Sequence, residues 1–331
     1  MNRQLRTAFP VLLALLICAS TLTAQTSAPS TSGGLIWTDP GDISSKDLRH
    51  GAGGESEQPK LPVKFLEEDK AGHNSKFEVE DANGTKWKAK LGIEAQPEVA
   101  ASRLMWAVGY FTNDNYLIRN LEVTGLPRKL RRGQGHVTSP NHLDQARLQK
   151  RPDGMDKAGE WKWKKNPFKG KREFNGLRVM MALLGNWDLK NDNNAIYTGK
   201  DGAKHYLVTD LGTAFGASGD RWTEAQSKND LQAYRTTKFI TKKTPKYVSF
   251  SFPRFPPFLY FFNLPHFLHQ WSMRSVGNKI PREDAKWIGS LLAQLSKKQI
   301  EDAFLAGGYS DEEASAFATA VQTRIAELNA L

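Results

Sequence analysis

The amino-acid sequence predicts an α+β fold with two lobes, a small β-rich lobe followed by a larger, mainly helical one. Between residues 62 and 91, apolar and polar residues alternate with the period of half-buried β-strands. Helices are expected over 173–184 and through the C-terminal third, where Ser296 and Ser310 each begin a capping-box pattern ahead of an amphipathic run. This order of strands and then helices favours one lobe stacked on the other.

We place the β-rich lobe at residues 61–120. A polar loop at 67–76 separates its first two strands, and a hairpin turn at 81–84 separates the second and third. Pro97 suits the first turn of a helix that ends near Gly109. The alternating apolar residues of the three strands are Val63 and Phe65, Phe77 and Val79, and Trp87, Ala89 and Leu91.

Residues 121–172 are expected to form a basic insertion before the helical lobe at 173–331. Within it, residues 128–172 carry fourteen Lys or Arg and four Asp or Glu, interleaved with Trp161 and Trp163. Lysines on phosphates and aromatic rings stacked on bases would make a nucleic-acid surface. The alternative is a solvated insertion whose tryptophans fold onto the core. We favour this alternative, so nucleic acid is not an expected partner, although the insertion could hold an anionic substrate beside a cleft.

The N-terminus predicts export. Arg3 and Arg6 precede an apolar run over 9–19, whose length is typical of a signal peptide. We expect a signal peptide over 1–24, a flexible leader rich in Ser, Gly and Pro over 25–60, and a periplasmic or extracellular location. Loss of the signal segment lowers the formal net charge from +11 to +9, which favours anionic partners, including an acidic membrane surface or cell wall. Later stretches are too short and too polar to span a membrane.

Two acidic residues and one asparagine stand where chemistry is expected. Asp188 and Asn193 lie five positions apart, just after the helix predicted over 173–184. Asp210 follows a predicted strand–turn–strand hairpin, and Gly212 leaves room for a backbone bend. Phosphoryl transfer needs a carboxylate that positions the acceptor hydroxyl and oxygen ligands for magnesium, and these residue types suit both tasks.

Two charged residues upstream complete the set that phosphoryl transfer needs. Lys90 ends the third predicted strand, and Glu98 lies at the start of the helix that follows. A lysine steadies the nucleotide phosphates in such enzymes, and a glutamate orients that lysine. The candidates therefore occur in the required order along the chain.

These segments resemble protein-kinase-like folds, in particular the phosphatidylinositol 3-/4-kinase and HipA-like branch. Residues 188–193, DLKNDN, are similar to the D-x-x-x-D-N catalytic loop of type II phosphatidylinositol 4-kinases. Residues 208–215, VTDLGTAF, are similar to the strand and metal loop that follow it there. Residues 72–77, GHNSKF, resemble the serine-containing phosphate loop of that branch. The resemblance covers roughly residues 60–216.

The resemblance implies ATP and Mg²⁺ as cofactors and a role for each of eight residues. The roles are Asp188 as catalytic base, Lys190 at the transferred phosphoryl group, Asn193 and Asp210 as magnesium ligands, Lys90 on the phosphates, Glu98 as the partner of Lys90, and Ser75 and Gly72 in the loop over the phosphates.

Two choices stay open, and two features depart from protein kinases. Lys88 competes with Lys90 because both point to one face of the strand, and Glu94 competes with Glu98 by proximity. The His-Arg pair that precedes the catalytic Asp of protein kinases is replaced here by residues 186–187, Asn-Trp, and no Ala-Pro-Glu sequence follows the metal loop. We therefore expect no ordinary activation segment.

The sequence thus predicts an exported, monomeric kinase-like protein that uses ATP and Mg²⁺ to phosphorylate a hydroxyl group of a protein, lipid or glycan. The alternative is a catalytically inactive kinase-fold protein of the cell envelope that binds an anionic surface polymer or nucleic acid. Export favours the alternative, because ATP is scarce outside the cytoplasm.

Overall fold

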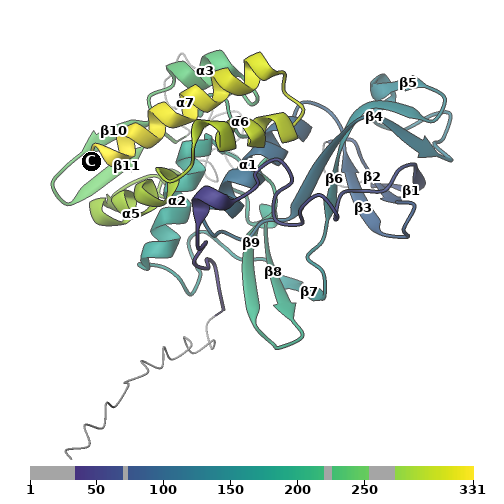
Figure 1. The fold of residues 1–331 in the computed structure, drawn as a ribbon. Coiled ribbons are helices and arrows are strands. Elements are labelled where there is room, and N and C mark those ends of the chain that lie inside the picture. Colours follow the sequence, from purple (N-terminus) through teal and green to yellow (C-terminus); the bar gives the residue numbers. More distant parts are fainter. Residues whose placement is uncertain (1–33, 70–73, 220–225, 253–272) are drawn as a thin grey trace, which may run out of the picture. The chain divides into compact units, whose positions relative to one another are not determined.

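The computed structural model describes residues 34–69, 74–219, 226–252 and 273–331, which form a mixed α+β protein as predicted (Figure 1). The predicted signal peptide over 1–24 and the predicted phosphate-loop residue Gly72 lie outside these residues.

A six-stranded sheet contains the three strands predicted between residues 62 and 91. Its order is β3–β2–β1–β4–β6–β5, and β3 also pairs with β6, so that five of the strands close into a ring. Phe77, Trp87, Leu121 and Leu148 are buried in the hydrophobic cluster of this sheet. The strands are β1 (Val63–Asp69), β2 (Lys76–Glu80), β3 (Lys86–Lys90), β4 (Asp114–Thr124), β5 (Val137–Ser139) and β6 (His142–Lys150).

The basic stretch is more integrated into the fold than we expected. β6 lies inside the expected insertion at 121–172, yet it pairs with both β3 and β4 in the six-stranded sheet. Trp161 and Trp163 are 2% and 4% exposed and belong to the main hydrophobic cluster. The expectation that the tryptophans fold onto the core is confirmed, and the neighbouring Lys162, Lys164 and Lys165 are exposed to solvent.

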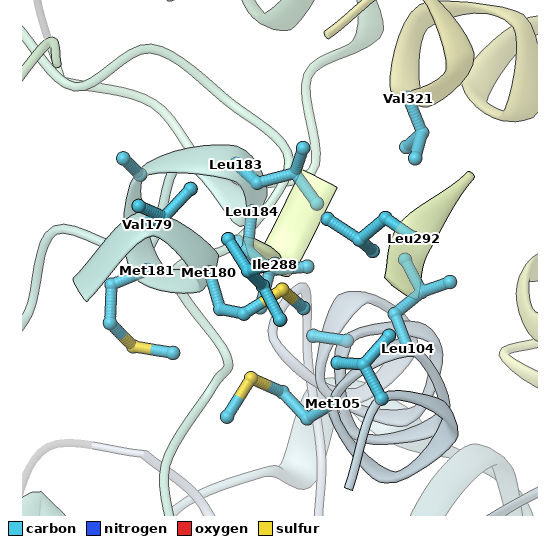
Figure 2. Packing of buried hydrophobic residues seen from close by; sticks show 14 of the residues in the cluster. Leu104, Met105, Val179, Met180, Met181, Leu183, Leu184, Ile288, Leu292 and Val321 are labelled. Atoms are coloured by element: carbon cyan, nitrogen blue, oxygen red, sulfur yellow. The ribbon is translucent and has the colours of Figure 1, made fainter. Parts of the chain in front are cut away.

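The helices build the main hydrophobic cluster. Figure 2 shows side chains of α1, α2, α5 and α7 gathered there, among them Leu104, Met180, Ile288 and Val321. Both predicted capping boxes are present, at Ser296 ahead of α6 and at Ser310 ahead of α7. The helices are α1 (Ala95–Ala107), α2 (Arg172–Leu184), α3 (Leu231–Thr236), α5 (Arg282–Leu292), α6 (Lys297–Ala306) and α7 (Asp311–Asn329), with single 3₁₀ turns at η2 (Ile43–Ser45), η3 (Gln134–His136) and η4 (Asn191–Asn193).

Helix α1 links the sheet to the other helices. It contacts β4 and β6 of the sheet and also α6 (Figure 1). Two three-stranded sheets complete the fold: β7 (Met155–Gly159), β8 (Asn194–Gly199) and β9 (Lys204–Val208), and β10 (Ile240–Lys243), β11 (Tyr247–Phe250) and β12 (Ile280–Pro281). Of the helices in the described ranges, none has the length and apolar character needed to cross a membrane.

Residues 34–60, expected to be mostly a flexible leader, are instead attached to the folded chain. Ile36, Ile43 and Leu48 are buried in the main hydrophobic cluster. The Gln299 side chain on α6 donates to the carbonyl oxygens of residues 43, 44 and 46, at 2.9, 3.2 and 3.0 Å. The apolar residues of this segment follow neither the period of a strand nor that of a helix. Their burial nevertheless makes residues 34–60 a structured N-terminal segment.

We predict that this segment contributes to stability. Ile43→Ala should lower the free energy of unfolding by about 2–5 kcal/mol, because it opens a cavity at a fully buried site. Arg49→Ala, at an exposed position of the same segment, should change it by less than about 0.5 kcal/mol. Urea unfolding of the two variants measures the difference, and equal midpoints would contradict a packed segment.

Candidate active site

Lys90, the last residue of β3, lies among three carboxylates and is 1% exposed. Its Nζ atom lies 2.7 Å from Glu94 Oε2, 3.0 Å from Glu98 Oε2 and 3.2 Å from Asp210 Oδ1. Burial alone would lower the pKa of Lys90, but Glu98 and Asp210 outweigh it and raise the pKa above its ordinary value. Lys90 is therefore a buried cation that connects β3, α1 and the segment after β9.

The two glutamates come from the start of α1. Gly92, with φ of 85°, takes the left-handed conformation that turns the chain from β3 toward the helix. Glu94 is the residue before α1, and Glu98 lies in its first turn. Sequence reasoning left these two as alternatives, whereas both contact Lys90 in the structure.

Glu94 has further partners. Its carboxylate accepts from Lys228 Nζ and Asn74 Nδ2, at 2.5 Å each. Burial would raise the pKa of Glu94, but the charge of Lys90 and the hydrogen bond from Lys228 outweigh it and lower the pKa. Glu98 is buried more completely, and there burial dominates and raises the pKa, against the opposing charges of Arg147 and Lys90.

Asp210 and Gly212 form a tight turn directly after β9. Asp210 Oδ1 accepts from the backbone N–H of Gly212 at 3.1 Å. A side chain at position 212 would place its Cβ 2.8 Å from Glu94 Cβ and 3.0 Å from Lys90 Nζ, so glycine lets this turn approach the charged cluster. Burial opposes ionisation of Asp210, but Lys90 and the Gly212 N–H keep its pKa below the ordinary value.

Asp188 lies on a loop that is connected to the Asp210 turn. Helix α2 ends at Gly185, which has φ of 68°, and the loop follows without regular structure up to η4. The Asn193 side chain donates to the Asp188 carbonyl at 2.7 Å, which closes the loop. The Asp188 N–H donates to Thr213 Oγ1 at 3.3 Å, and Thr213 Oγ1 donates to the Asn186 side chain. These bonds fix the catalytic-loop candidates against the turn that carries Asp210.

Three side-chain oxygens at this site accept no hydrogen bond from a described residue. Asp188 Oδ1 is buried and has no hydrogen-bond partner in the described ranges, while Oδ2 lies 3.1 Å from Lys190 Nζ. Asn193 Oδ1 and Asp210 Oδ2 likewise accept no hydrogen bond from described residues. Carboxylate and amide oxygens are the ligands that Mg²⁺ prefers, usually one or two per ion beside phosphate and water. Asn193 and Asp210 therefore fit a magnesium ion.

A cleft of about 1070 Å³ opens beside these residues. Lys90, Glu98, Asn193 and Asp210 line it, together with residues of β2, β3, β6 and β8. Asp188, five residues before Asn193, does not line this cleft. The nucleotide-binding and metal-binding candidates therefore share one cavity, and the side chain of the proposed base, which is 20% exposed, is not among the residues that line it.

The structure also shows where two other candidate residues, Lys88 and Ser75, lie relative to the cleft. Lys88 also lines the cleft, but it is more exposed than Lys90 and forms an ion pair with Asp69 at 2.8 Å. Lys90 is thus the lysine that meets Glu98. Ser75 does not line the cleft; its carbonyl accepts from the Leu91 N–H at 3.0 Å.

Sequence reasoning missed Arg147 and Thr213. Arg147 Nη2 lies 3.3 Å from Glu98 Oε2. It reaches the site because β6 pairs with β3, and a register between strands so far apart in the chain leaves no local sequence signal. Thr213 lies inside the segment 208–215 that we matched to a metal loop, so its position could have been noticed.

No protein-family model and no curated protein matches this chain. Among solved structures, it is similar to the crystal structure of a Helicobacter pylori proinflammatory kinase, CtkA, with 11% identity and a TM-score of 0.46 over 82% of this chain and 97% of that chain. It is also similar to the Golgi casein kinase, with 12% identity and a TM-score of 0.35 over 87% of this chain and 78% of that chain. Both likenesses are remote, and we base the functional proposal on the site itself.

We predict that Glu94 makes folding sensitive to acid. Because the pKa of Glu94 is lowered in the folded protein, its stabilising effect is present at neutral pH and is lost as the pH falls below the ordinary value of 4.5. Glu94→Gln should be less stable at neutral pH and should lose less stability between about pH 6 and pH 3. Urea midpoints across this range test it, with the exposed Glu122→Gln as control; parallel pH curves for wild type and Glu94→Gln would refute it.

Proposed function

We propose that this chain is a two-lobed, kinase-like phosphotransferase that uses ATP and Mg²⁺ and belongs near the phosphatidylinositol 3-/4-kinase and HipA-like branch. One observation carries the proposal: Lys90 Nζ lies 3.0 Å from Glu98 and also 3.2 Å from Asp210, a residue 120 positions further along the chain than Lys90. Phosphoryl transfer needs a lysine oriented by a glutamate beside a metal-binding aspartate.

The remaining residues take roles that their contacts support. Lys90 would bind the phosphates, and Asn193 and Asp210 would hold Mg²⁺, since all three line one cleft. Magnesium would neutralise charge on the phosphates during transfer. Asp188 would accept the proton of the acceptor hydroxyl at Oδ1, the oxygen that Lys190 leaves free. The acceptor would be a hydroxyl group of a protein, lipid or glycan.

For a partner we propose an anionic surface that contacts residues 160–171, which we call the lysine loop. Lys162, Lys164, Lys165 and Lys169 are exposed there and form no ion pair with a described residue. Trp161 fixes the loop by donating to the Leu207 carbonyl at 2.8 Å. Because the loop tryptophans are buried, they are not available to stack on nucleobases, which favours a phosphate-rich surface over nucleic acid. This partner also suits the export expected from the sequence.

We predict that Mg-ATP stabilises the mature chain, residues 25–331. At a hundredfold excess over Kd the melting temperature should rise by roughly 5 °C. Asp210→Asn should abolish the shift because it weakens metal binding, and Asp156→Asn, exposed on β7, should retain it. Differential scanning fluorimetry with ATP, with and without Mg²⁺, measures both; no shift at millimolar nucleotide would favour the inactive alternative.

We predict that the lysine loop binds anionic surfaces. Wild type should sediment with vesicles containing phosphatidylglycerol and be released by salt, since the contact is electrostatic. Charge reversal of Lys162, Lys164, Lys165 and Lys169 to Glu should abolish binding. The matched control reverses four other exposed lysines, Lys238, Lys242, Lys243 and Lys279. Equal loss in both variants would show a general charge effect and contradict the assignment to the loop.

A further inference from the structure

A row of three basic residues crosses the sheet at the cleft. Lys76 on β2 lies opposite Lys90 on β3, and Lys90 lies opposite Arg147 on β6. All three line the cleft, and directly opposed residues of antiparallel strands share one face of the sheet. Like charges in such pairs are destabilising, so this row requires acidic partners.

One oxygen of Glu98 forms ion pairs with two of these cations. Its Oε2 atom lies 3.0 Å from Lys90 Nζ and 3.3 Å from Arg147 Nη2. Arg147 is 3% exposed, and its Nη1 donates to the Asn115 side chain at 3.2 Å. A planar guanidinium held at two points has a fixed direction, whereas the flexible stem of a lysine does not.

We propose that Arg147 is a positioning residue that acts through Glu98, holding this carboxylate where it orients Lys90 toward the phosphates of the nucleotide. The inference rests on the proposed function and deepens it. Without Arg147, Lys90 would be the only described residue that forms an ion pair with Glu98, and Lys90 also forms ion pairs with Glu94 and Asp210.

The electrostatics of the site agree with this role. Burial raises the pKa of Glu98, and the charge of Arg147 is the first effect that opposes the rise, ahead of Lys90. Arg147 thus supports the ionised form of the carboxylate that Lys90 needs.

Arg103 provides a matched control. It is also 3% exposed, and its Nη2 donates to the Asn115 carbonyl at 2.8 Å, but it does not line the cleft and has no contact with Glu98. Replacement of either arginine removes a buried cation bonded to Asn115. Only the loss of Arg147 removes a partner of Glu98.

The test is a double-mutant cycle at Arg147 and Glu98. The measured quantity is the Kd for a fluorescent ATP analogue in the presence of Mg²⁺. Arg147→Met should weaken binding roughly tenfold in the wild type and hardly at all in the Glu98→Gln background, because the two side chains act as one unit. Arg103→Met should leave the Kd unchanged within about twofold. Arg147→Lys keeps the positive charge but loses the planar, forked guanidinium, so its Kd should lie between those of wild type and Arg147→Met. If Arg147→Met does not fold, Arg147→Lys takes its place in the cycle.

Two results would overturn the inference. An unchanged Kd in Arg147→Met would remove any role, and an equal loss in the Glu98→Gln background would make Arg147 a direct ligand contact instead. A measurement without nucleotide distinguishes failure of this inference from failure of the proposed function. In lysine-selective NMR spectra the buried Lys90 ammonium should be protected from exchange in wild type and Arg103→Met and lose that protection in Arg147→Met; retained protection would overturn the positioning role even if no nucleotide binds.

Discussion

The Lys90 ammonium and the carboxylates around it are the constraint on which the rest of the site depends. Transfer of a charge from water into a protein interior costs several kcal/mol unless partners compensate it. The partners of Lys90 come from three separate segments: the residue before α1, the first turn of α1, and the turn after β9. These segments must therefore be assembled together with β3, and the cluster couples the closed sheet to the helices that pack on α1.

This coupling also explains the local chemistry of the neighbouring residues. Gly212 suits this turn because a Cβ atom there would lie 2.8 Å from Glu94 Cβ, too close for an undisturbed backbone, and would crowd Lys90 Nζ. Thr213, one residue later, links the same turn to the Asp188 loop. A single short turn thus connects the charged cluster to the candidate base, and displacement of one would displace the other.

Local patterns in the sequence predicted those parts of the protein that local physics decides. Strand alternation, the capping boxes and the spacing of Asp188, Asn193 and Asp210 all depend on residues close together in the chain, and the structure places Asn193 and Asp210 at one cleft. Arg147 could not be predicted, since it reaches Glu98 only through the pairing of β6 with β3. The N-terminal segment was mistaken for a leader because Ile36, Ile43 and Leu48 are isolated apolar residues whose burial depends on helices far away in the chain.

Stability alone is a weak explanation for such a cluster. Buried ion pairs can often be replaced by apolar residues of similar volume with no loss of stability. Nor would an anionic polymer need one, because exposed cations such as those of the lysine loop suffice for surface binding. A buried lysine held among carboxylates, next to free oxygens of Asn193 and Asp210, is instead suited to a ligand that brings both phosphate and a divalent metal. The two candidate functions therefore use different parts of the chain, and surface binding by the lysine loop is compatible with phosphoryl transfer at the cleft.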